Sequence, residues 1–206
     1  MEPQDSIFPN SYHKAGSPTS IQTPKKRSSA FREWIQVIII ALIVALPVRF
    51  YIAEPFIVNG ASMDPTFSTG QFLIVDRLSY RFQQPARGEV IVFEYPNNPS
   101  IYYIKRIIGL PGETVSIKNG KVSISDLAHP EDFALTEPYI EASHASTDSA
   151  KVTLGPSEYF VMGDNRSQSS DSRAWGPLDK SYIIGRPAAR LFPISTVSAF
   201  PGEYKE

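Results

Sequence analysis

Apolar and polar positions divide the chain of 206 residues into three parts. Residues 1–30 are rich in Pro, Ser, Thr, Gln and Lys and have few aliphatic side chains, so they cannot bury enough apolar surface to offset the entropy lost on ordering. A nearly unbroken apolar run follows, and short apolar segments separated by turns occupy residues 54–206. We therefore predict a disordered tail, one apolar helix and a globular domain.

The apolar run is strictly hydrophobic only from Val37 to Val48, which is shorter than the roughly 20 residues that cross a bilayer. It becomes long enough when the flanking aromatic and aliphatic residues are included, which extends it over residues 31–53. Basic residues precede its core: Lys25, Lys26, Arg27 and Arg32. By the positive-inside rule, this pattern predicts a transmembrane anchor with the tail in the cytoplasm and the globular domain on the other side.

Two other interpretations of the run remain open. A cleaved signal peptide has a similar profile of charge followed by apolar residues, but no small-x-small site ends this run. A buried core helix would normally keep one polar face, whereas this segment is apolar almost all round. The uncleaved anchor fits the sequence better than either alternative.

The rest of the chain has the pattern of a β protein. Short runs of β-branched and aromatic residues, mostly separated by Gly or Pro, predict strands at 72–77, 89–93, 102–108, 114–118, 121–125 and 158–163. Asn119-Gly120 lies between two alternating runs and predicts a hairpin. Residues 126–157 are polar with little pattern, so we expect a surface excursion. The predicted fold is a mostly β, antiparallel domain on one N-terminal transmembrane helix.

Composition excludes several classes of function. The formal net charge of -1 argues against a nucleic-acid binder, which normally has a basic excess. There are no cysteines, which excludes disulfides, zinc–cysteine sites and thiol nucleophiles. The three histidines have no metal-ligand spacing. We therefore expect neither a metal nor an organic cofactor.

The stretch "VNGASMDPTF" contains the first candidate for chemistry, Ser62. It is either a solvated turn residue after Asn59-Gly60 or a nucleophile. A serine hydroxyl is a weak nucleophile and needs an adjacent base, and no histidine here is an evident partner. A lysine can serve if its amine is neutral, which requires a pKa well below the usual value of about 10.4.

Lys105, in "IYYIKRIIGLPG", is the candidate base. On a strand, Tyr103, Lys105 and Ile107 share one face, and desolvation in such an apolar setting lowers the pKa of an amine. Arg106 is excluded because a guanidinium stays protonated. The alternative is an exposed strand lysine, or one that guards a sheet edge against aggregation.

A third candidate is the polar stretch "MGDNRSQSSDSRAWGP", residues 162–177. It predicts a dense hydrogen-bonded loop, which is either a simple surface loop, a calcium loop or part of a site. Asp164 and Asp171 are its only carboxylates, and Arg166 and Arg173 add positive charge, which argues against calcium.

Together these stretches resemble the signature boxes of type I signal peptidases. In order, the matching stretches are Ser62-Met63-x-Pro65-Thr66, "RGEVIVF" (87–93), "YIKRIIGLPGE" (103–113) and "GDNRSQSSDSRAWG" (163–176). The resemblance extends from about Trp34 to Phe192. A single anchor before the catalytic domain is similar to the one-helix members of Gram-positive bacteria and cyanobacteria.

The resemblance implies a role for each matching residue. Ser62 is the expected nucleophile, its backbone N–H an oxyanion donor, and Lys105 the general base. Some members add a hydroxyl two residues before the nucleophile; Gly60 occupies that position here, so a second donor would be backbone, water or absent. The serine that bonds the catalytic lysine corresponds to Ser169. The expected structural residues are Asp164, Arg166, Asp171 and Arg173, with Asp171–Arg173 as an ion pair.

The implied function is a membrane-anchored serine endopeptidase that removes signal peptides from exported preproteins. Cleavage would follow a small-x-small motif, typically Ala-x-Ala, through an acyl-enzyme. The expected partners are preprotein signal peptides and the lipid bilayer, on which residues 50–58 would rest, and no nucleic acid is expected. The expected location is the plasma membrane, or also the thylakoid membrane in a cyanobacterium.

Two rival functions are kept. A self-cleaving Ser–Lys protease of the repressor type shares the dyad and a related β fold, but it would carry a DNA-binding helical domain where this chain has the apolar run. An anchored β domain with a degenerate site would only bind peptides or assemble a complex.

Overall fold

The computed structural model of the chain describes residues 30–47, 53–128 and 131–204. The chain divides into two compact units, Met1–Ala41 and Leu42–Glu206. The predicted tail lies outside the described residues up to residue 29, and the predicted anchor lies outside them at 48–52. Helix α1, Ala30–Pro47, forms where the sequence is rich in Ile, Leu and Ala, and its residues 31–46 are all exposed. Among the described residues, no helix combines the length and apolarity that a membrane crossing requires.

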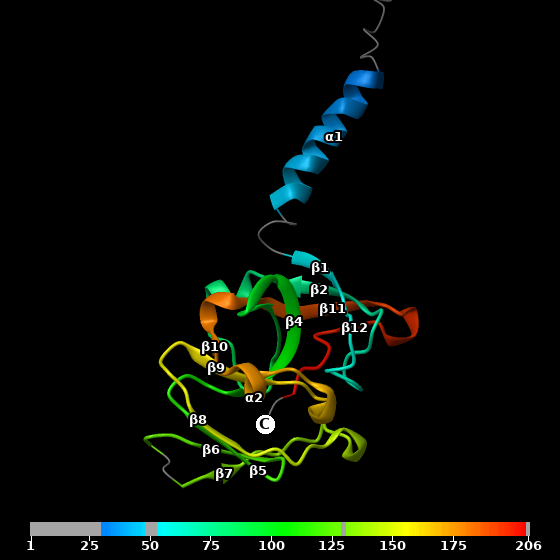
Figure 1. Cartoon of the computed structure of the whole chain (residues 1–206). Coiled ribbons are helices and arrows are strands. Elements are labelled where there is room, and N and C mark those ends of the chain that lie inside the picture. The colour runs from blue at the N-terminus through cyan, green and yellow to red at the C-terminus, as the bar shows by residue number, and fades with distance from the viewer. Residues whose placement is uncertain (1–29, 48–52, 129–130, 205–206) are drawn as a thin grey trace, which may run out of the picture. The chain divides into compact units, whose positions relative to one another are not determined.

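The second unit is built on two antiparallel sheets, which Figure 1 shows one above the other. The larger sheet has the order β1 (Ala53–Ile57), β2 (Phe72–Asp76), β11 (Ile183–Phe192), β3 (Val90–Tyr95), β4 (Asn98–Gly109), β9 (Glu158–Met162) and β10 (Leu178–Asp179), and β12 (Ser198–Ala199) pairs with β11. The smaller sheet has the order β7 (Phe133–Ala134), β6 (Lys121–Ser125), β5 (Thr114–Lys118) and β8 (Ala150–Thr153). This confirms the predicted mostly β, antiparallel domain.

Short helices lie between the strands. They are η2 (Ser79–Arg81), η3 (Ala142–His144), η4 (Arg166–Gln168), α2 (Ser172–Trp175), η5 (Lys180–Tyr182) and η6 (Ile194–Thr196). The segment 126–157, expected as a surface excursion, contains β7, η3 and β8, and β8 pairs with β5.

The predicted hairpin is confirmed. Strands β5 and β6 pair from Thr114↔Ser125 to Lys118↔Lys121. Asn119 and Gly120 have φ values of 51° and 75°, the left-handed geometry of the two-residue turn that fits the twist of paired strands. A Cβ at Gly120 would lie 1.9 Å from Ser146 O, so glycine is also needed there for close backbone approach.

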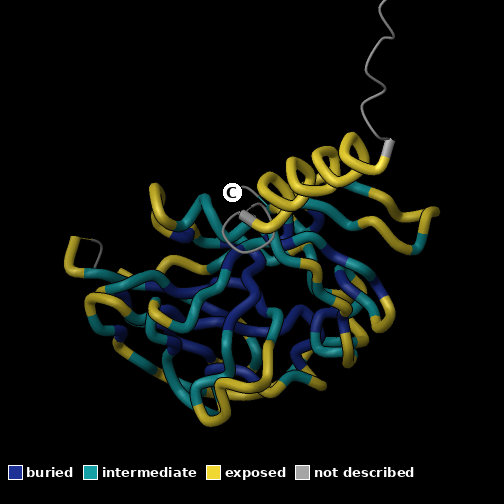
Figure 2. Tube along the Cα trace, turned by 90° about the horizontal axis from the view of Figure 1, so that it is seen from above, coloured by how far each residue is buried: buried dark blue, intermediate teal, exposed yellow. Residues whose placement is uncertain are grey.

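Three clusters of buried side chains form the core, and β4 contributes to all of them. Ile107 packs with residues of β3, β9 and β10, while its neighbour Ile108 packs between β9 and the smaller sheet. Ile104 packs beside the cluster around Met63 and Phe67. In Figure 2 the buried positions gather along the strands in the middle of this unit. The second half of β4, from Lys105 to Gly109, is therefore buried on both faces, whereas its first residues are exposed.

Candidate active site

Ser62 lies in the loop between β1 and β2. The base of this loop is closed by a hydrogen bond from Val58 N–H to Gln71 O (2.9 Å). Beyond Ser62 the chain makes a helical turn, in which Phe67 N–H donates to Met63 O (2.8 Å), and both side chains are buried in the core. Because the turn is anchored on either side of it, Ser62 has a fixed place at the surface of the core.

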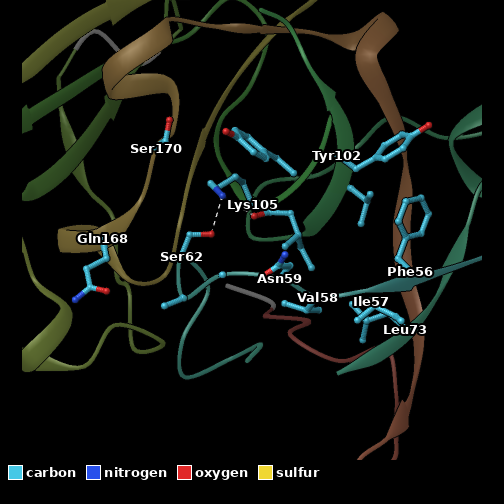
Figure 3. A pocket seen from close by; sticks show the side chains of 15 residues that line it. Phe56, Ile57, Val58, Asn59, Ser62, Leu73, Tyr102, Lys105, Gln168 and Ser170 are labelled. Carbon is cyan, nitrogen blue, oxygen red and sulfur yellow. Dashed lines mark hydrogen bonds between the residues drawn. The ribbon is translucent and has the colours of Figure 1, made fainter. Parts of the chain in front are cut away.

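Lys105 lies in β4 between β3 and β9, and only 3% of it is exposed. A hydrogen bond of 2.8 Å joins its Nζ to Ser62 Oγ, and Figure 3 shows the two side chains pointing toward each other. The amine also donates to Ile104 O (3.0 Å) and lies 4.9 Å from the centre of the Tyr103 ring. The two candidates for base and nucleophile, far apart in sequence, are thus in direct contact.

Burial lowers the pKa of Lys105 from 10.5 to about 8, although the negative charges of Asp171 and Asp164 act in the opposite direction. Desolvation prevails because the ammonium loses its hydration inside an apolar sheet. At pH 7 about a tenth of the amine is therefore unprotonated and can accept a proton, a far larger fraction than for a lysine with a pKa of 10.5.

The polar loop after β9 holds the backbone around Ser62. Asn165 N–H donates to Ser62 O (3.1 Å), and the Asn165 side-chain amide donates to Ala61 O (3.0 Å). A Cβ at Gly163 would lie 2.3 Å from Ser62 O, so glycine allows the two segments to touch. Loop and serine turn therefore form one packed unit.

Asp164 is fully buried and forms a two-pronged ion pair with Arg106. Arg106 Nε and Nη2 lie 2.8 and 2.6 Å from its two carboxylate oxygens, and Thr66 Oγ1 donates to it as well (2.6 Å). Arg106 Nη1 donates to the carbonyls of Gly88 and Gly202, both at 2.7 Å. The desolvation cost of a buried ion pair is offset only when its remaining hydrogen-bonding groups also have partners, as they do here.

Asp171 and Arg173 form an ion pair with a shortest distance of 2.7 Å. The Asp171 carboxylate also caps α2 by accepting from Arg173 N–H (3.2 Å) and accepts from Gly163 N–H (3.1 Å). Burial alone would raise the pKa of Asp171, but the hydrogen bonds and charge of Arg173 hold that pKa below its usual value. Arg166 is also buried, and it pairs with Glu137 from the segment 126–157.

Ser169 packs beside the dyad without bonding to it. Its Oγ is buried and has no hydrogen-bond partner of good geometry, and it lies close enough to the Asp171 carboxylate to favour its charged form. A Cβ at Gly163 would lie 2.3 Å from this oxygen. The hydrogen bonds of Lys105 go to Ser62 and Ile104 instead.

Gly60 turns the chain two residues before Ser62 with a φ of 108°, a region that disfavours any residue with a side chain. Its N–H donates to Thr69 Oγ1 (3.0 Å), and the same hydroxyl donates to Gly60 O (3.1 Å). A hydroxyl-bearing residue would therefore be strained at this position. Within the described residues, no hydrogen bond uses the Ser62 N–H, so this donor is available to a ligand.

A cleft of about 280 Å³ opens at the dyad. One wall is apolar and comes from β1, the residue after it, β2, β3 and β4: Phe56, Val58, Leu73, Val92, Tyr102 and Ile104. Gln168 and Ser170 lie on the opposite side of Ser62 and Lys105 (Figure 3). The cleft thus offers narrow apolar surface directly beside the serine. Across the described ranges of the chain, no three acidic or histidine side chains gather as metal ligands.

Sequence reasoning missed three residues that support this site. Arg106 was considered only as a base, and Asn165 and Glu137 were given no role. The first has a local signal, since a second cation inside an apolar strand must find a buried partner. The other two act through contacts with distant segments, which the sequence does not reveal.

Comparisons with known proteins agree with the resemblance. The model of the family "signal peptidase, peptidase S26" matches residues 31–192. A probable signal peptidase I-1 of Synechocystis sp. is 37% identical over 171 residues, covering 80% of this chain and 84% of that protein. A signal peptidase I of Bacillus licheniformis is 34% identical over 189 residues, covering 87% and 97%. The crystal structure of a signal peptidase I from Enterococcus faecalis has 29% identity and a TM-score of 0.43, covering 50% of this chain and 97% of that one.

Proposed function

Because the chain belongs to the signal peptidase family, peptidase S26, we propose that it removes signal peptides through a Ser62–Lys105 dyad while anchored in a membrane. Signal-peptide removal follows from the family. The assignment of nucleophile and base is carried by one observation, the 2.8 Å hydrogen bond between Ser62 Oγ and an amine that is 3% exposed.

Acylation begins when neutral Lys105 takes the proton of Ser62 Oγ, which attacks the scissile carbonyl carbon. The new C–O bond gives a tetrahedral oxyanion, stabilised by the free N–H of Ser62. Collapse breaks the C–N bond, and the Lys105 ammonium gives its proton to the leaving amine. Water, deprotonated by Lys105, then hydrolyses the ester, which releases the signal peptide as an acid and restores both side chains.

The other site residues act by holding this pair in place. We assign Asp164, Arg166, Asp171 and Arg173 to the structure of the loop, in line with their buried ion pairs. We propose that the buried Ser169 hydroxyl, which has no hydrogen-bond partner of good geometry, supports the site by accepting from the Lys105 ammonium once that forms. Gly60 gives the turn its geometry, and the second oxyanion donor is therefore backbone or water.

The substrate is an extended segment ending in a small-x-small motif. Strand β1 lies at the end of its sheet, so a peptide can add alongside it as a further strand. Such a peptide would pass the apolar wall next to Ser62, where the cleft of about 280 Å³ accepts small side chains.

We further propose that residues 31–53 anchor the enzyme, with the tail in the cytoplasm and the β domain outside. The apolar side chains of α1 are exposed along its described length, which is unfavourable in water, and basic residues precede them. Enzyme and preprotein would then share one membrane, which raises their effective concentration.

The test is cleavage of a preprotein by the full chain in detergent. Ser62→Ala and Lys105→Ala should each lower kcat/KM by at least about 10³-fold, with circular dichroism still of β type. Lys151→Ala, at an exposed position of β8, is the matched control and should cleave normally. Substantial activity of Lys105→Ala would show that another group is the base.

A further inference from the structure

Glu137 and Tyr139, which we call the clamp, lie in the segment between β7 and β8. They are two residues apart, yet each contacts a different arginine of the catalytic region. Neither side chain lines the cleft beside Ser62. The clamp therefore touches the supports of the dyad and not the dyad itself.

Glu137 binds Arg166 in a two-pronged pair. Arg166 Nη1 lies 3.1 Å from one carboxylate oxygen and Nη2 contacts the other. The exposed fractions of the two side chains are 9% and 2%, so the pair is largely removed from water. Planar pairs of this kind fix orientation as well as charge.

Arg166 passes this constraint on to the serine turn. Its Nε donates to Gly163 O (3.1 Å). Gly163 in turn touches two residues of the site, because a Cβ there would lie 2.3 Å from both Ser169 Oγ and Ser62 O. A shift of Arg166 must therefore move the backbone that packs against Ser62.

Tyr139 acts on the other half of the dyad. Its ring lies 4.0 Å from the Arg106 guanidinium carbon, a cation–π contact on the residue that follows Lys105. The Tyr139 hydroxyl donates to Glu137 Oε1 (3.0 Å), which couples both halves of the clamp. The ring also meets Tyr204 edge-on, with centroids 5.6 Å apart.

We propose that Glu137 and Tyr139 are positioning residues for catalysis. Through Arg166 and Arg106 they hold the Ser62 turn and the Lys105 strand in register, so that the proton transfer distance is kept during turnover. This inference rests on the proposed function of the dyad. It gives the segment 126–157 a role in the chemistry in addition to its place on the surface.

The experiment measures kcat and KM of the full chain in detergent on a preprotein. Glu137→Gln keeps size and one acceptor but removes the charge that Arg166 needs. We expect kcat to fall about ten- to hundred-fold, the range for small misplacements of reacting groups, with KM unchanged because the cleft is untouched. Tyr139→Leu, which removes the ring from Arg106, should also lower kcat, whereas Tyr139→Phe retains the ring and should keep most of the activity.

Glu141→Gln is the matched control, since this carboxylate is in the same segment but 58% exposed, and its kcat should equal that of the wild type. Thermal unfolding gives the folded fraction by which each kcat is normalised. If Glu137→Gln does not fold, the comparison of kcat between Tyr139→Leu and Tyr139→Phe tests the proposed positioning role. Normalised kcat values within two-fold of wild type for folded Glu137→Gln and Tyr139→Leu would overturn the inference, as would a rise in KM alone. An inactive wild type would instead refute the proposed function.

Discussion

At the scale of single residues, the buried amine of Lys105 links catalysis to stability. The sheet around it is dry, and dry surroundings favour the uncharged form of an amine. The same surroundings make the protonated form costly, so the proposed general base weakens the fold. Both effects have the same cause and can be measured separately.

The first expectation concerns rate. In the proposed mechanism only neutral Lys105 accepts the serine proton, and burial lowers the pKa of Lys105 to about 8. With a soluble peptide substrate, kcat/KM should rise tenfold per pH unit below that value and level off above it. A rate that stays flat down to pH 5 would assign the base to another group.

The second expectation concerns stability. The pKa of Lys105 is lowered from 10.5 to about 8 on folding, so between these values the unfolded chain holds more protons and stability rises with pH. Lys105→Met removes this penalty and should be more stable than wild type by up to about 3 kcal/mol at pH 7, with the gain lost above about pH 10. Urea unfolding across this range is the measurement. Lys118→Met, at the exposed end of β5, is the matched control.

The ion pair of Asp164 and Arg106 predicts that a single substitution of Asp164 strongly lowers the free energy of unfolding. Asp164→Asn leaves a guanidinium that is 1% exposed without its counter-charge, which should cost about 3–5 kcal/mol of unfolding free energy. Asp148→Asn removes a carboxylate that is 55% exposed from Arg173, and an effect of about 0.2–1 kcal/mol is expected. Equal losses in the two variants, measured by urea unfolding, would show that burial is not the deciding factor.

At the scale of elements, the sequence predicts strand bounds well wherever apolar and polar residues alternate regularly. The strands at 114–118 and 121–125 and their turn were predicted with their observed bounds. Strand β11 was missed because Gly185 and Pro187 interrupt it, and the pairing with β2 shifts register just after that proline. A break of this kind in the pattern looks like a turn, although the sheet absorbs it as an irregularity.

The site was predictable to the same extent. The apolar setting of Lys105 is a local property and was legible in the sequence. The contacts of Asn165 with the Ser62 turn and of Glu137 with Arg166 join segments far apart in the chain, and no local pattern encodes them. Sequence therefore indicated the two side chains that come into contact, Ser62 and Lys105, better than the framework that holds them.

The close packing of the loop after β9 predicts that one added methyl group, at Gly163, strongly lowers kcat. Gly163→Ala would place a Cβ 2.3 Å from both Ser169 Oγ and Ser62 O, so either the loop or the serine turn must move. We expect a loss of kcat of about 10²-fold. Gly155→Ala is the control, because its new Cβ meets only the flexible side chain of Glu158 at 3.1 Å. Similar activities of the two variants would contradict tight packing at the dyad.

At the scale of the whole molecule, the apolar rim of the cleft bears on how the enzyme meets lipid. Ile57 is 69% exposed, and Phe56 beside it packs on the Tyr102 ring with centroids 5.2 Å apart. We propose that this rim rests on the membrane. Phe56→Ser with Ile57→Ser should then lower the ratio of the peptide cleavage rate with lipid vesicles to the rate without them, a ratio from which any weaker peptide binding at Phe56 cancels. Unchanged stimulation would place the lipid contact elsewhere.

The hydrogen bond from Arg106 to Gly202 O (2.7 Å) has a consequence for the stability of the chain during its synthesis. Residues of the serine turn, the base strand and the polar loop are all made before residue 202, yet the arginine beside the base lacks one acceptor until that carbonyl arrives. A chain that has not reached this carbonyl therefore has one unsatisfied N–H on a guanidinium that is 1% exposed, which destabilises the region beside Lys105. Protein shortened before residue 202 should therefore unfold at a lower urea concentration than the full chain, with a loss of at least about 1 kcal/mol of unfolding free energy.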